Sequence, residues 1–108
     1  MKRILLCLMV ALFATGCLFA KNNDEKMNVM SYNIRYDNLG DKDNQWKFRR
    51  DFAADLVKFY EADVFGAQEV LNNQLNDLLN RLPEYAYVGV GREDGKTKGE
   101  YAPIFYRK

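Results

Sequence analysis

Three polar side chains stand where they could act together on a metal ion. Asn33 lies late in a segment with strand-like alternation, Glu69 follows a short apolar run, and Glu100 precedes another apolar segment. Magnesium prefers oxygen ligands, keeps several water molecules and often touches only one or two protein carboxylates. Together the three residues predict such a site. Taken singly, each has a simpler explanation, as a turn former, a helix start and a loop acid respectively.

Glu69 is the centre of this prediction because of the segment that carries it, residues 63–70. Val64, Phe65 and Ala67 form an apolar run that is too short for a helix and lies between two amphipathic helical segments. This pattern is typical of a buried strand in an α/β protein. Such folds bind ligands at the carboxyl ends of their strands, which is where Glu69 stands.

The remaining elements follow from periodicity and turn residues. Alternation predicts strands over residues 28–36, 85–92 and 101–107 in addition to 63–70, and helical spacing predicts helices over residues 46–61 and 71–82. Pro103 predicts a bulge or a missing pairing in the last strand. The order is β-α-β-α-β-β, so the fold class is α/β, with a sheet that needs further partners.

The first predicted helix carries a stripe of large apolar residues. They recur at helical spacing and are Phe48, Phe52, Leu56, Phe59 and Tyr60. A stripe of this kind normally faces the interior. We interpret these side chains as core packing and not as a cofactor site.

The amino terminus has the features of an export signal. Two basic residues precede a short apolar run, which predicts a signal peptide over residues 1–20, followed by a polar tether over residues 21–26. Residues 14–17, Ala-Thr-Gly-Cys, resemble a bacterial lipobox, in which Cys17 is acylated; ordinary cleavage after Ala20 is the alternative. We expect a periplasmic, outer-membrane lipoprotein or secreted location, with membrane contact only through a lipid on Cys17.

The charge balance and the cysteine content limit the kinds of partner and of metal site that the sequence predicts. The 108 residues contain 16 Lys+Arg and 15 Asp+Glu, a balance that does not indicate nucleic acid as a partner. Four scattered arginines are interpreted as solvated or ion-paired and not as a nucleic-acid surface: Arg35, Arg49, Arg50 and Arg92. Cys7 and Cys17 both fall in the signal segment, so the remaining domain has no disulfide and no zinc-cysteine site.

Four motifs in sequence order resemble the N-terminal part of the endonuclease/exonuclease/phosphatase superfamily, in particular its exported bacterial members. They are Met-Ser-Tyr-Asn-Ile-Arg at residues 30–35, Trp46-x-x-Arg49, Gly-Ala-Gln-Glu-Val at residues 66–70, and Gly-Glu-Tyr-Ala-Pro-Ile-Phe-Tyr-Arg at residues 99–107. The resemblance covers residues 27–108. It implies part of a four-layer α/β sandwich, two facing sheets with helices outside, that hydrolyses phosphate esters, phosphodiesters among them, with Mg²⁺ or Mn²⁺.

The resemblance also assigns roles to residues. Glu69 would bind the metal, Asn33 would orient the metal or the phosphate, and Tyr106 would lie near the site. These assignments make Asn33, Glu69 and Tyr106 the candidate catalytic residues, with Asn33 and Glu69 as metal ligands.

The later motifs of the family are missing from these residues. The family carries a histidine with an acidic partner, a Gly-Asp-x-Asn segment and a closing Asp-His pair, whereas the 108 residues contain no histidine. We expect an N-terminal fragment, cut by an incomplete gene or an early stop, with no hydrolase activity alone. The alternative is a small exported lipoprotein with a non-catalytic α/β binding module. The sequence does not indicate which phosphate ester is the substrate.

Overall fold

The computed structural model describes residues 25–108. The expected signal peptide over residues 1–20, Cys17 and most of the tether over residues 21–26 lie outside the described residues. Within residues 25–108, no helix combines the length and the apolar character that a membrane crossing requires.

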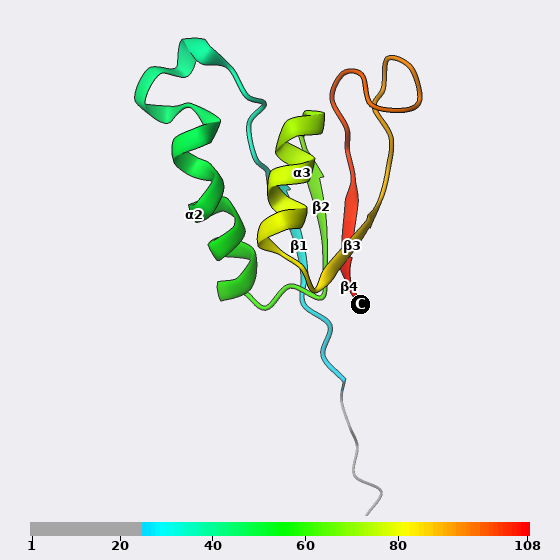
Figure 1. Ribbon diagram of the computed structural model, residues 1–108. Coiled ribbons are helices and arrows are strands. Elements are labelled where there is room, and N and C mark those ends of the chain that lie inside the picture. Colours follow the sequence, from blue (N-terminus) through cyan, green and yellow to red (C-terminus); the bar gives the residue numbers. More distant parts are fainter. Residues whose placement is uncertain (1–24) are drawn as a thin grey trace, which may run out of the picture.

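A four-stranded mixed sheet forms the centre of the fold. Its strands, in spatial order, are β1 (Val29–Asn33), β2 (Val64–Gln68), β4 (Ile104–Arg107) and β3 (Tyr85–Val88). The first two strands run parallel, and β4 is antiparallel to both of its neighbours. The connections contain a short 3-10 segment, η1 (Leu39–Asn44), and two helices, α2 (Trp46–Phe59) and α3 (Asn72–Arg81) (Figure 1). The predicted α/β class and element order are confirmed.

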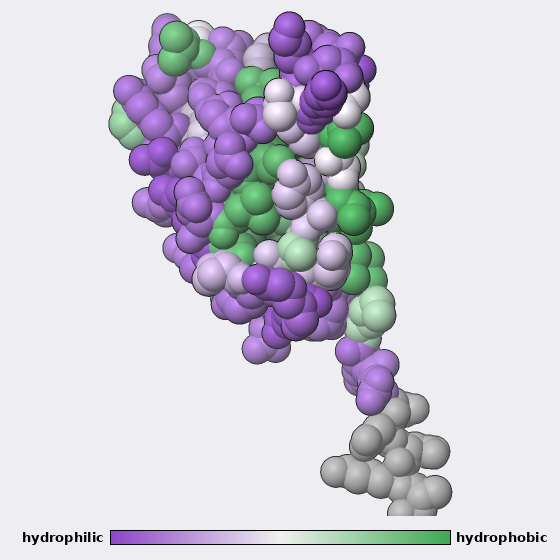
Figure 2. Space-filling view, turned by 45° about the vertical axis from the view of Figure 1, so that its right-hand side comes forward, coloured by the Kyte–Doolittle hydropathy of each residue, from purple (hydrophilic) through white to green (hydrophobic). Residues whose placement is uncertain are grey.

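Both helices cover the same face of the sheet (Figure 1). On that face Phe65 and Phe105 are fully buried, and their rings stack with centroids 4.5 Å apart. Because side chains alternate along a strand, the neighbouring residues point to the opposite face. That helix-free face carries exposed apolar side chains, namely Val29, Val88, Ile104 and Tyr106. In the space-filling view, hydrophobic residues reach the surface in the middle of the molecule and along its right-hand edge, between largely polar surfaces (Figure 2).

The core is the layer between the sheet and the two helices. Among its buried members are Trp46, Ala53, Ala54 and Val57 from α2, Leu75 and Leu78 from α3, and Phe65, Ala67 and Phe105 from the strands. The alanines let α2 approach closely, because their side chains end at Cβ. The indole nitrogen of Trp46 donates to Oδ2 of Asp77 at 2.8 Å, which ties α2 to α3.

The prediction that the apolar stripe of the first helix packs in the core is wrong. Phe48, Phe52 and Phe59 are 61%, 67% and 77% exposed; Tyr60 is also exposed, and Leu56 is half-buried. The helix has two apolar faces, and the one with smaller side chains packs on the sheet. The spacing of the large aromatics was helical, but spacing alone does not decide which face meets the sheet.

Several strand boundaries also differ from the prediction: β2 is two residues shorter at its carboxyl end, β3 ends at Val88 and not at residue 92, and two further differences have a backbone reason. β1 ends at Asn33, before residue 36, because Arg35 adopts a left-handed conformation with φ of 61° that a strand does not accommodate. The last strand begins only at Ile104, after Pro103, and Tyr101 makes an isolated bridge to Val70. The interruption predicted at Pro103 is thus confirmed.

The corrected core predicts unequal costs for two substitutions. Phe52→Ala should change the free energy of unfolding by no more than about 0.5 kcal/mol, because the ring is largely exposed. Leu78→Ala should lower it by about 2–5 kcal/mol, because it empties a buried position. Urea unfolding followed by circular dichroism measures both. A loss for Phe52→Ala as large as that for Leu78→Ala would show that the aromatic face is covered in solution.

Candidate metal-binding site

The parallel pairing of β1 with β2 brings the candidate residues together. The register aligns Asn33 with Gln68, and the Ile34 amide donates to the Gln68 carbonyl at 3.2 Å. The carboxyl ends of the two strands therefore lie side by side, and Glu69 is the first residue after β2. Across this end, Nδ2 of Asn33 donates to Oε1 of Glu69 at 3.0 Å. The predicted proximity of Asn33 and Glu69 is what the structure shows.

The second carboxylate oxygen of Glu69 is also held. The Tyr36 backbone N–H donates to Oε2 at 3.3 Å, from the segment that follows β1. Glu69 itself has a φ of 58°, in the left-handed region that residues other than glycine rarely adopt. Such conformations cost energy and are concentrated at functional sites. Here the unusual backbone turns the chain from β2 toward α3 with the Glu69 carboxylate facing the end of β1.

Hydrogen bonds keep the Glu69 carboxylate ionised. The Asn33 amide, followed by the Tyr36 backbone N–H, lowers the pKa of Glu69 below its ordinary value because both stabilise the charged form. The charge of Arg35 also lowers the pKa of Glu69, but the Arg35 guanidinium donates to both carboxylate oxygens of Asp41, each at 3.1 Å. Within residues 25–108, Glu69 takes part in no ion pair. The charge of Glu69 is therefore oriented by neutral donors, which suits a ligand for a cation.

The Asn33 side chain is fixed at both of its polar atoms. Its Oδ1 accepts from the Arg35 N–H at 2.9 Å, while its Nδ2 faces Glu69. The amide oxygen has a second lone pair, which can still face a ligand. In this arrangement the Asn33 side chain holds Oε1 of the Glu69 carboxylate.

Two other residues of the predicted site do not join this pair. Glu100 precedes Tyr101, which bridges Val70, so it lies at the same end of the sheet as Glu69, but its carboxylate pairs with Nη1 of Arg92 at 2.7 Å. Tyr106 lies opposite Val64 at the start of β2, about 13 Å along the strand from the position of Gln68. The expectation that Tyr106 lies near Glu69 is therefore not met, because the antiparallel register carries it to the other end of the sheet. Within residues 25–108, no three acidic, histidine or cysteine side chains are clustered so that they could hold a metal. Glu69 is the candidate metal-binding carboxylate.

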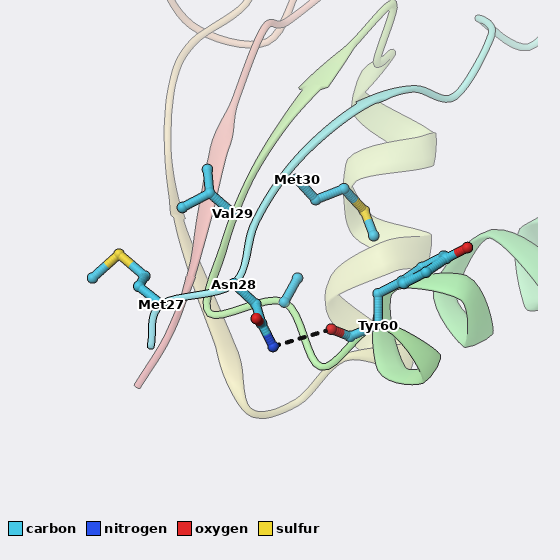
Figure 3. Close-up of a pocket in the computed structure, with 6 residues that line it drawn as sticks. Met27, Asn28, Val29, Met30 and Tyr60 are labelled. Carbon is cyan, nitrogen blue, oxygen red and sulfur yellow. Dashed lines mark hydrogen bonds between the residues drawn. The ribbon is translucent and has the colours of Figure 1, made fainter. Parts of the chain in front are cut away.

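A surface cavity lies at the other end of β1, away from this pair. It has a volume of about 480 Å³ and is lined by Met27, Asn28, Val29, Met30, Tyr60 and Ala62, at the amino end of β1. Nδ2 of Asn28 donates to the Tyr60 carbonyl across it at 3.4 Å (Figure 3). The site of Glu69 is at the opposite end of the same strand.

Sequence reasoning missed the residues that hold the segment after β1. Arg49 was interpreted as solvated or ion-paired, yet it donates to the carbonyls of Asn44 at 2.6 Å and Ile34 at 2.8 Å. The other three arginines are ion-paired as expected, in the pairs Arg35–Asp41, Arg50–Asp77 and Arg92–Glu100. The spacing of Trp46 and Arg49 was visible in the sequence, but it does not reveal that the partner of Arg49 is backbone.

Solved structures of similar sequence share this fold. An endonuclease/exonuclease/phosphatase from Bacteroides vulgatus is 56% identical with a TM-score of 0.71, over 72% of this chain and 30% of its own. A family protein from Bacteroides thetaiotaomicron is 44% identical with a TM-score of 0.73, over 76% of this chain and 31% of its own. A mannosyl-6-phosphatase from the same species is also 44% identical, with a TM-score of 0.74, over 77% and 32%.

The chain belongs to the endonuclease/exonuclease/phosphatase family and corresponds to the N-terminal part of these neighbours. It spans 30–32% of their length. No family model matches the sequence, and the comparison with curated proteins gives no match. The fold at this coverage is that of a partial α/β sandwich.

The site geometry predicts that Asn33→Ala raises the pKa of Glu69 toward its ordinary value. The substitution removes the largest contribution to the lowered pKa, the hydrogen bond from Nδ2. Because the charged form of Glu69 loses this stabilisation, the carboxylate becomes protonated at a higher pH than in the parent protein. Side-chain ¹³C chemical shifts followed during an acid titration measure this. Asn28→Ala, at the other end of β1, is the control and should leave the Glu69 titration unchanged. An unaltered titration in Asn33→Ala would contradict the assigned hydrogen bond.

Proposed function

We propose that this chain supplies the metal-binding part of the active site of a Mg²⁺- or Mn²⁺-dependent phosphoester hydrolase. The observation that supports it best is the Glu69 carboxylate, which two neutral donors orient and which no cation of residues 25–108 pairs with. Hard cations prefer such oxygen ligands and complete their shells with water. The donor set is therefore suited to magnesium or manganese.

The residues have distinct tasks in this proposal. Glu69 holds the ion, and Asn33 and the Tyr36 N–H keep its carboxylate in a fixed orientation. When bound, the metal supplies a Lewis acid for a phosphoryl oxygen. Glu69 must be ionised for this task, and the hydrogen bonds that lower its pKa extend the range over which it is ionised to lower pH. Because the 108 residues contain no histidine, they do not supply a histidine as general acid or base, and we expect no turnover from this chain alone.

The substrate class is a phosphate ester. The neighbour named as a mannosyl-6-phosphatase makes a sugar phosphate the first substrate to test, with a phosphodiester as the second. The predicted export signal over residues 1–20 favours a substrate outside the cytoplasm, and a lipid on Cys17 would keep the site at a membrane surface. These assignments rest on sequence and similarity, and each is separate from the metal proposal.

Metal binding is the direct test of this function. The full chain should bind Mn²⁺ with one site, measured by the relaxation of water protons. Glu69→Gln removes the negative charge at nearly constant shape, so the affinity should fall by about 10–100-fold or more. Glu84→Gln is the matched control, since Glu84 is an exposed glutamate in the turn before β3, and it should bind as the parent does. Equal affinity in the parent and in Glu69→Gln would contradict the proposal.

Hydrolysis can be tested in a chimera. Residues 25–108 replace the matching segment of the Bacteroides vulgatus family protein, which is 56% identical over the aligned part. With Mg²⁺, the chimera should hydrolyse a sugar phosphate or a phosphodiester, and Glu69→Ala in the chimera should reduce kcat by at least about 100-fold. Glu84→Gln in the same chimera should retain its activity. A folded chimera that keeps its activity after Glu69→Ala would remove Glu69 from the reaction.

A further inference from the structure

Gln74 is a polar side chain at the centre of the folded layer. It is 0% exposed and is the buried polar residue of the part of the chain that the structure describes. Polar groups are costly to bury unless they are hydrogen-bonded, so its contacts carry information. It belongs to the first turn of α3, just after the segment that carries Glu69.

All the contacts of Gln74 are to backbone groups near the Glu69 site. Oε1 accepts from the Leu71 N–H and from the Asp37 N–H, each at 3.0 Å. Nε2 donates to the Arg35 carbonyl at 2.8 Å. The first contact is the usual return bond from the third residue of a helix to its N-cap. The other two reach the segment after β1, so Gln74 joins the two chain segments between which the Glu69 carboxylate lies.

The contact to Arg35 acts on the hydrogen bond to Glu69 through a single peptide unit. The Arg35 carbonyl and the Tyr36 N–H belong to the same planar peptide group and point in opposite directions. Gln74 makes the shorter hydrogen bond to the oxygen side of that group, at 2.8 Å against 3.5 Å for Nη2 of Arg49, and Glu69 accepts from its nitrogen side at 3.3 Å. Donation to a carbonyl also polarises the peptide and strengthens its N–H as a donor. The orientation of the Tyr36 N–H is thereby coupled to Gln74.

We infer that Gln74 is a positioning residue for the Glu69 carboxylate. It fixes the Arg35–Tyr36 peptide so that the Tyr36 N–H faces Oε2 of Glu69, and through Leu71 it fixes the start of the helix that follows Glu69. The inference rests on the proposed function only in that the positioned group is the proposed metal ligand. The arrangement of the peptide is independent of any bound ion.

Gln74→Met in the full chain tests this with two readouts. The methionine side chain is about as long as that of glutamine, but it has no amide group to make the hydrogen bonds with Leu71, Asp37 and Arg35. The Tyr36 amide should exchange with solvent about 10-fold faster relative to amides at the far end of the sheet, and the Mn²⁺ affinity should fall by about 10-fold. Tyr85→Phe is the matched control, because it removes a buried hydrogen bond from the Tyr85 hydroxyl to the Ala62 carbonyl at the opposite end of the sheet. It should change neither readout.

A purely structural role predicts a different result. Gln74→Met and Tyr85→Phe would then both lower the thermal midpoint while leaving Tyr36 exchange and the Mn²⁺ affinity of the folded protein as in the parent, and the inference would be overturned. If Gln74→Met does not fold, Gln74→Asn decides on the same two readouts, since it keeps a neutral amide but is one methylene too short to hold the Leu71, Asp37 and Arg35 contacts together. If the parent itself binds no Mn²⁺, the proposed function fails, while the Tyr36 exchange still decides the positioning role.

Discussion

The parallel pairing of β1 with β2 is the constraint on which the candidate site depends. If the two strands were antiparallel, their carboxyl ends would lie at opposite edges of the sheet. In the observed parallel register, Asn33 at the end of β1 lies beside Gln68 at the end of β2. Parallel neighbours need a crossover connection, and here η1 and α2 provide it on the face where α3 also packs. Buried side chains of α2 and α3 stabilise this register, so the packing of the core and the geometry at Glu69 have the same origin.

Backbone groups, more than side chains, give the site its shape. The Tyr36 N–H donates to Glu69, the Arg35 N–H holds the Asn33 amide, and Arg49 donates to the Ile34 carbonyl. The left-handed φ angles of Arg35 and Glu69, 61° and 58°, allow the chain to turn sharply beside each strand end. Conformations of this kind persist only where surrounding contacts determine them, and the hydrogen bonds of Arg49 and Gln74 are such contacts.

The helices, the strands and the proximity of Asn33 to Glu69 could be predicted from the sequence, whereas the face of α2 that packs on the sheet could not. Alternation and apolar runs depend on the local chain, so the strand around Phe65 and its polar end at Glu69 were recognisable. The choice between the two apolar faces of α2 depends on close packing against the sheet, which favoured Ala53 and Val57 over Phe52. Tyr106 was misplaced because a motif gives no strand register, and Gln74 was missed because its partners are backbone groups distant in sequence.

The most direct test of the site is to locate Mn²⁺ on the uniformly ¹⁵N-labelled full chain by paramagnetic broadening of amide signals. At substoichiometric Mn²⁺, the strongest broadening should centre on the amides of Asn33, Tyr36 and Glu69, with amides at the amino ends of β1 and β2 least affected. That pattern would establish the ion at the carboxyl ends of the parallel strands. Broadening centred instead on the Asp41 loop or around Asp63, with Glu69 unaffected, would contradict the account.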